Sequence, residues 1–124
     1  ARYANERAAF GGHIADFQGL RWQLADAQTD IEAARLLAYR AVLAVEDGTA
    51  AELPAAHAKK FAARMADTHL ARAMQVMGAA GLRREYPIGR QIACARIANY
   101  VDGTTEIQNE RIARALFKQA RDGS

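Results

Sequence analysis

The residues from Tyr100 to Gln108, YVDGTTEIQ, place one acid beside a glycine between two stretches with a helical pattern. A carboxylate at such a turn can accept a proton as a general base if the fold holds it against a substrate. The same residues also fit an ordinary turn, since Gly ends helices and Thr begins them. Local sequence therefore leaves Asp102 with two interpretations, a catalytic base or a turn residue.

Other reactive side chains form no recognisable site. The three histidines, His13, His57 and His69, lack the spacing of metal ligands, so we predict no metal site. The basic side chains between Arg111 and Arg121 suit a solvated helix face near the negative end of a helix dipole. They need no bound ligand.

The composition is that of one folded domain. The chain has 124 residues, of which 51% are hydrophobic and 25% are charged, as in ordinary globular proteins. The net charge of +3 comes from basic residues scattered among 14 acids, so we expect no nucleic-acid partner. No apolar run is long enough to predict a membrane span, and the single cysteine, Cys94, fits a cytoplasmic location.

A long helix is expected over the first third of the chain. Apolar residues recur at alternating spacings of three and four between Asp16 and Asp47, and Gly48 can end the helix in a left-handed conformation. The expected buried seam is Phe17, Leu20, Leu24, Ala27, Ile31, Ala34, Ala38, Ala41 and Val45.

Three further helices are expected after this long helix. Pro54 should lie in the first turn of a second long helix that ends near Gly78, and Pro87 should open a shorter third helix that Gly103 ends. Thr105 and Gln108 have capping-box spacing and should begin the last helix. The expected buried side chains of these last two helices include Ile97, Tyr100, Ile107 and Leu116.

The opening ARYANERAAF has the pattern of the end of a truncated first helix. With no strand pattern in the chain, we predict an all-α fold, an antiparallel up-down four-helix-type bundle with an extra short helix. The many alanines in the seams predict a close approach between helices.

Five motifs occur in order along nearly the whole chain: RxxFG, FQ, LADxxTxIEAAR, EYP and GTxEIQ. Together they resemble the C-terminal helical domain of the acyl-CoA dehydrogenases. The resemblance implies that residues 1–124 are one domain of a larger three-domain enzyme. It also implies a homodimer or homotetramer, an acyl-CoA substrate, and an electron-transfer flavoprotein or a similar acceptor.

The resemblance gives Asp102 a role. In the family a carboxylate base at this position removes the α-proton of an acyl-CoA thioester, while the β-hydrogen leaves as hydride to FAD. The backbone N–H of the base also polarises the thioester carbonyl, and Gly103 is carried over as a substrate contact. The positions carried over as FAD contacts are Arg7, Phe10, Gln18, Gln75, Gly78, Ala79, Thr104 and Glu106.

The chain departs from the family pattern at the base itself. Asp stands where Glu is usual, which withdraws the carboxylate by about 1.5 Å. Some superfamily branches related to the nitroalkane oxidases use Asp here, so an oxidase relative is one alternative function. The other is a non-catalytic helical module or subunit for oligomerisation, in which Asp102 is only a turn residue. In either case we expect the 124-residue chain alone to be inactive.

Overall fold

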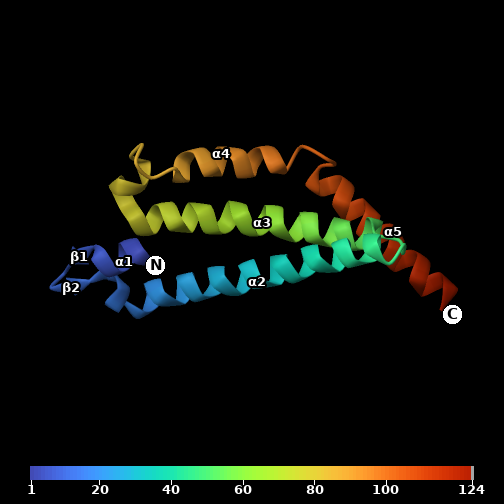
Figure 1. Cartoon of the computed structure of the whole chain (residues 1–124), viewed down its shortest axis with the longest axis horizontal. Helices are drawn as coiled ribbons and strands as arrows, with labels where there is room; N and C mark the ends of the chain where they lie inside the picture. Colours follow the sequence, from blue (N-terminus) through green and yellow to red (C-terminus); the bar gives the residue numbers. More distant parts are fainter. Residues whose placement is uncertain (124) are drawn as a thin grey trace.

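The computed structural model describes residues 1–123, which form helices joined by short turns (Figure 1). The elements in chain order are α1 (Arg2–Glu6), β1 (Ala8–Ala9), β2 (Gly12–His13), the 3-10 helix η1 (Ile14–Asp16), α2 (Gln18–Glu46), α3 (Glu52–Met77), the 3-10 helix η2 (Gly78–Leu82), α4 (Ile88–Ala98) and α5 (Thr105–Asp122). The predicted all-α class is confirmed. The sequence pattern did not reveal the small antiparallel strand pair β1–β2.

Helix α3 is the centre of the arrangement. Helices α2 and α4 run antiparallel to it on opposite sides, and α5 packs against it before extending beyond the other helices (Figure 1). Within residues 1–123, no helix is both long enough and apolar enough to cross a membrane.

The helix ends predicted at Gly48 and Gly78 are confirmed, whereas α4 ends at Ala98, five residues before the predicted Gly103, because Asn99 caps it and donates its side-chain amide back to the Ala95 carbonyl. Gly48 has φ of +65° and follows α2. The N–H of Thr49 donates to the Ala44 carbonyl at 2.8 Å, and the N–H of Gly48 donates to the Val45 carbonyl at 3.1 Å. These two bonds form a Schellman motif, which satisfies carbonyl groups that the helix end would leave unpaired. Gly78, with φ of +55°, caps α3.

The buried residues of the two long helices are alanines. Ala44 of α2 is 8% exposed, and Ala56 and Ala63 of α3 are 1% and 5% exposed. Alanine lets two helix backbones approach closely, and the burial of these alanines supports the close approach expected from the composition.

The predicted buried seam differs from the structure at four positions. Phe17 was expected to be buried but is 44% exposed, because it precedes the first turn of α2 as its N-cap and its ring packs edge-on against the exposed ring of Phe10. Ile31 and Val45 were expected to be buried but are 40% and 67% exposed. The physical reason is a polar contact between the helices, in which the Oδ2 atom of Asp30 lies 2.7 Å from Nε2 of His69 in α3. Asp30 therefore faces α3, and Ile31 turns outward. Ala38 is likewise exposed.

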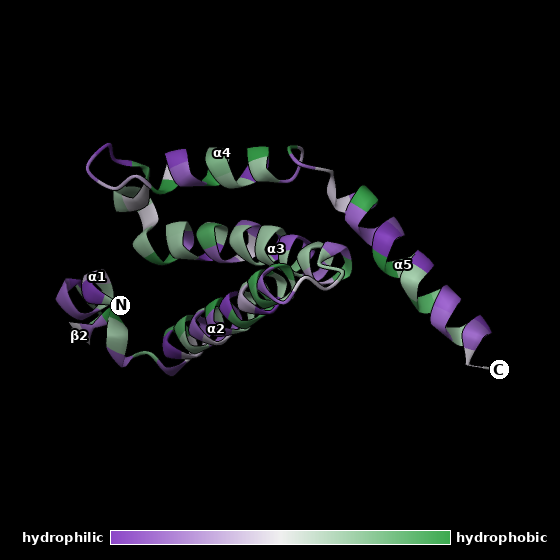
Figure 2. Ribbon diagram, turned by 45° about the vertical axis from the view of Figure 1, so that its right-hand side comes forward, coloured by the Kyte–Doolittle hydropathy of each residue, from purple (hydrophilic) through white to green (hydrophobic). Residues whose placement is uncertain are grey.

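Some apolar residues of the last two helices were also wrongly predicted to be buried. Ile97 is 58% exposed, Tyr100 is 62%, Ile107 is 48% and Leu116 is 61%. Because α5 packs mainly on α3 and α4 on α3 and η2, much of their apolar surface has no cover from this chain. Figure 2 shows hydrophobic turns along α5 where it extends away from the other helices.

The end of α2 provides a test of backbone conformation without a change in packing. Replacing Gly48 by Ala should lower the free energy of unfolding by about 1–2 kcal/mol, because an L residue is strained at positive φ. Apart from neighbouring atoms along the chain, no described heavy atom lies within 4 Å of the added methyl group at Gly48 or at the helical control Gly19. Gly19→Ala should instead raise stability by about 0.5–1 kcal/mol. Urea denaturation measures both, and equal shifts would contradict this account.

Candidate functional site

The loop between α4 and α5 holds Asp102 in an unusual conformation. Its φ is +55°, and that of the following Gly103 is +92°. The left-handed region costs a residue with a Cβ about 1–2 kcal/mol, so the surroundings must hold Asp102 there. The side chain of Asp102 is exposed. A strained acid presented outward in this way is a typical feature of functional sites.

A buried glutamine holds this loop. Gln108 is only 2% exposed, and its Nε2 donates to the carbonyl oxygens of Asp102 at 3.3 Å and Gly103 at 3.1 Å. Its Oε1 accepts from Nη1 of Arg111 at 3.3 Å, and Nε of Arg111 lies 3.3 Å from Oε1 of Glu52 in α3. A Cβ added to Gly103 would lie 2.7 Å from Nε2 of Gln108. Glycine at 103 therefore leaves the space that the glutamine amide fills.

The predicted capping box of Thr105 and Gln108 is wrong. The N-cap of α5 is Thr104, whose Oγ1 accepts from the backbone N–H of Ile107 at 3.4 Å. Thr105 instead donates its hydroxyl to Oδ1 of Asn99 at 3.1 Å. Because the Gln108 amide holds the loop carbonyls, the spacing that suggested a capping box serves a different purpose.

Helix α3 anchors the loop from two further positions. Nζ of Lys59 donates to the Val101 carbonyl at 3.1 Å. Oδ2 of Asp67 accepts from Nη1 of Arg96 at 3.0 Å and from Nδ2 of Asn99 at 3.1 Å. Polar side chains of α3 thus fix the end of α4 and the segment before Asp102.

Two charged groups beside the loop have shifted pKa values. Hydrogen bonds from its own backbone N–H and from the Thr104 hydroxyl lower the pKa of the Glu106 carboxyl. Tyr100, and then Asp67, raise the pKa of the Arg96 guanidinium. Both shifts favour the charged forms, so the loop lies between an anion at the start of α5 and a cation at the end of α4.

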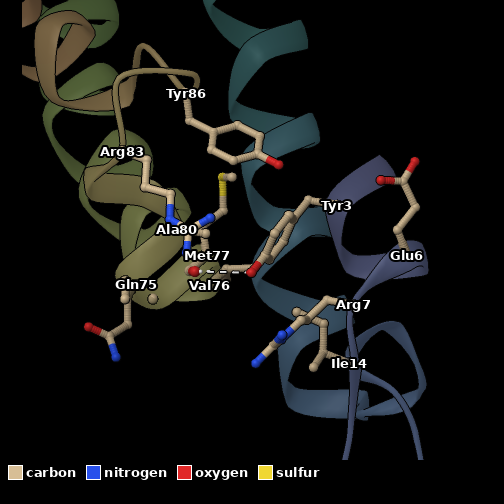
Figure 3. A pocket seen from close by; sticks show the side chains of 12 residues that line it. Tyr3, Glu6, Arg7, Ile14, Gln75, Val76, Met77, Ala80, Arg83 and Tyr86 are labelled. Atoms are coloured by element: carbon tan, nitrogen blue, oxygen red, sulfur yellow. Dashed lines mark hydrogen bonds between the residues drawn. The ribbon is translucent and has the colours of Figure 1, made fainter.

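A second group of predicted residues lies together at the other end of α3. Arg7, Gln75, Gly78 and Ala79 line one cavity of about 500 Å³ formed by α1, the end of α3 and η2 (Figure 3). Four of the eight positions predicted to contact FAD therefore meet in one place.

The other four predicted positions lie elsewhere. Phe10, at the turn between the two strands, is 95% exposed, and its ring contacts that of Phe17 edge-on with centroids 6.0 Å apart. Gln18 begins α2 and is exposed. Thr104 and Glu106 belong to the loop end of the molecule. Along α3, the 16 residues from Lys59 to Gln75 correspond to about 24 Å.

Several residues of the two ends were not predicted. Gln108 is 2% exposed in the structure. Its place within the GTxEIQ motif is the sequence signal that could have pointed to it. Lys59 and Asp67 carry no motif. Within residues 1–123, no group of three or more His, Cys, Asp or Glu residues is placed to hold a metal ion.

The buried glutamine can be tested by stability. Gln108→Leu leaves the carbonyls of Asp102 and Gly103 without their donor and should lower the free energy of unfolding by about 1–3 kcal/mol. The matched control is Gln119→Leu at an exposed position of the same helix, which should change stability by less than about 0.5 kcal/mol. Urea denaturation with amide hydrogen exchange at Gly103 reports both effects. Similar losses of unfolding free energy in the two variants would show that the Gln108 amide does not hold the loop.

Several known proteins are similar to this chain in sequence, and several solved structures are similar to it in fold. The chain is 36% identical over 116 residues to the short-chain specific acyl-CoA dehydrogenase of Clostridium acetobutylicum, covering 94% of this chain and 31% of that protein. It is 35% identical over 118 residues to the caffeyl-CoA reductase-Etf complex subunit CarC of Acetobacterium woodii, covering 95% and 31%. The structure of an FAD complex of PigA superposes with a TM-score of 0.89 at 31% identity, covering 93% and 30%.

The chain thus spans less than a third of the length of these relatives. The family model of the acyl-CoA dehydrogenase C-terminal domain matches residues 1–117. A match over nearly the whole chain is enough to assign it, and the chain belongs to the acyl-CoA dehydrogenase family as its C-terminal domain.

Proposed function

We propose that residues 1–124 are the C-terminal domain of a larger three-domain, FAD-dependent acyl-CoA dehydrogenase in which Asp102 is the general base. The observation that carries the proposal is the left-handed conformation of Asp102, held by the buried amide of Gln108. Gly would adopt this conformation without strain, so the presence of Asp at this position favours a role for its carboxylate. The alternative of a non-catalytic oligomerisation module leaves the strain at Asp102 unexplained.

The residues of the loop suit abstraction of an α-proton. The carboxylate of Asp102 accepts the proton, and its backbone N–H donates to the thioester carbonyl, which stabilises the developing enolate. Gly103 has no side chain to obstruct an acyl chain. FAD, when bound, supplies the acceptor for the hydride that leaves the β-carbon. Because Asp is one methylene shorter than Glu, substrate must approach the backbone of this loop more closely by about 1.5 Å.

The cavity at the other end of α3 suits part of FAD. Arg7 forms no ion pair within residues 1–123, so its guanidinium is available for a phosphate. Gly78, at φ of +55°, and Ala79 add little bulk beside Gln75. Phe10 and Gln18 lie outside this cavity, where exposed side chains can reach a cofactor held mainly by another copy.

The distance between the two ends supports sharing of FAD between copies. Thr104 and Glu106 belong to the loop end of the molecule, which Lys59 contacts through Val101. Lys59 lies 16 residues, about 24 Å along α3, from Gln75, and this separation keeps the two ends from surrounding one compact portion of a cofactor. Each copy would then supply its cavity to one FAD and its loop to another, as in a homodimer or homotetramer. Leu36, Leu116 and Phe117, which are 66%, 61% and 65% exposed, provide apolar surface for a second copy or for the other domains.

The further partners follow from the family. We propose an acyl-CoA thioester as substrate and an electron-transfer flavoprotein as electron acceptor, supported by the relative named as part of an Etf complex. An oxidase that uses oxygen is the alternative for the second half-reaction. The single Cys94 supports the proposed cytoplasmic location.

The proposed base can be tested in the flavoprotein that contains this domain. Asp102→Asn should slow deuterium exchange at the α-carbon of bound acyl-CoA by about 10²–10⁴-fold, because the amide cannot accept the proton. Acyl-CoA binding should persist. Asp47→Asn, a change of the same kind at the exposed C-cap of α2, is the control and should exchange normally. Undiminished exchange in Asp102→Asn would assign the base to another residue.

The need for further domains or copies predicts a simple property of the 124-residue chain. Purified alone, it should be colourless and lack dehydrogenase activity, because it has no complete pocket for the flavin ring. Visible absorbance and a denatured extract measure the bound flavin. A yellow preparation with one flavin per chain would refute this prediction.

A further inference from the structure

A second arginine faces the cavity that contains Arg7. Arg83 follows η2 in an extended conformation, with φ of −76° and ψ of 152°, and its backbone N–H donates to the Ala80 carbonyl at 3.0 Å. This turn directs its side chain into the cavity from the wall opposite Arg7 (Figure 3). Arg83 belongs to none of the motifs discussed above.

Neither guanidinium is neutralised by the chain. The side chains of Arg7 and Arg83 form no ion pair within residues 1–123. Glu6 is the one acid among the residues that line the cavity, and its carboxylate points away from both guanidinium groups (Figure 3). The cavity therefore presents two positive groups to a ligand.

The wall between the two arginines is fixed. The Tyr3 hydroxyl donates to the Met77 carbonyl at 3.2 Å, and the rings of Tyr3 and Tyr86 meet edge-on with centroids 5.9 Å apart. These contacts join α1 to the end of α3 and to the segment that carries Arg83. Arg7 and Arg83 are thus held on facing walls by contacts that need no ligand.

We propose that Arg83 is a second phosphate-binding residue and that the cavity selects a diphosphate, that of FAD, over a monophosphate. Guanidinium groups on facing walls can each form paired hydrogen bonds with a different phosphate of a diphosphate, whereas a monophosphate offers a single phosphate and less charge to the two groups together. The inference rests on the proposed function, which places FAD at Arg7. It adds a residue that sets the preference for the diphosphate.

The test compares ADP, AMP and FAD as ligands of the 124-residue chain, titrated into the millimolar range and followed by backbone amide shifts at Gln75 and Gly78. The wild-type chain should bind ADP more tightly than AMP. Arg83→Ala should weaken ADP binding about tenfold, to the level of AMP, because it removes a charge-assisted contact. Arg83→Lys should recover part of the loss. Arg84→Ala removes the same charge one residue away, at a side chain that does not line this cavity, and should change the affinity less than about twofold.

The outcomes separate the two proposals. If Arg7→Ala weakens ADP binding while Arg83→Ala behaves like Arg84→Ala, the role of Arg83 is wrong and the FAD site stands. If ADP shifts no amide in the cavity, the inference about Arg83 fails, whereas the proposed function stands, because it places the rest of the flavin pocket in other domains or copies. Binding of ADP without binding of FAD would assign the cavity to a free nucleotide and would also overturn the inference. Circular dichroism confirms that each variant is folded.

Discussion

The buried amide of Gln108 is the interaction on which the loop end of this domain depends. One side chain donates to two successive carbonyls, so it holds Asp102 and Gly103 together in the left-handed region. The same amide accepts from Arg111, which reaches Glu52 at the start of α3. One connected group of polar contacts therefore joins α5, α3 and the loop of Asp102. Its buried member is the Gln108 amide, whose bonds to the two carbonyls are costly to break, while the Arg111–Glu52 pair is exposed.

Helix α3 connects that loop to the cavity. Lys59 and Asp67 of this helix fix the segment before Asp102, and its last turns supply Gln75 and the carbonyl of Met77 to the cavity. A helix of 26 residues is long enough to keep the two ends well apart. This separation explains why residues of one family motif set do not gather in one place within a single chain.

The ends of α2 and α3 and the start of α4 could be predicted from sequence because their signals are local. Gly48 and Gly78 end helices through their own conformations, and Pro87 precedes α4 as its N-cap. The face that each helix buries depends on distant partners instead. Ile31 lost its predicted buried place because the neighbouring Asp30 pairs with His69, 39 residues away.

The candidate site shows the same division between local sequence signals, which could be predicted, and contacts between distant residues, which could not. Family motifs pointed to Asp102 and to the residues of the cavity, whereas no pattern could show that Lys59 would reach the Val101 carbonyl, 42 residues away. The loop of Asp102 and the cavity of Arg7 nevertheless both contact one continuous helix, α3. A rotation of α3 by a single residue, about 100°, would turn Lys59 and Asp67 from the loop and Gln75 from the cavity together. The packing of α2 on α3 therefore sets the orientation of the side chains at the loop and at the cavity together. A rotation of α3 that changed the contacts at one end would also change those at the other.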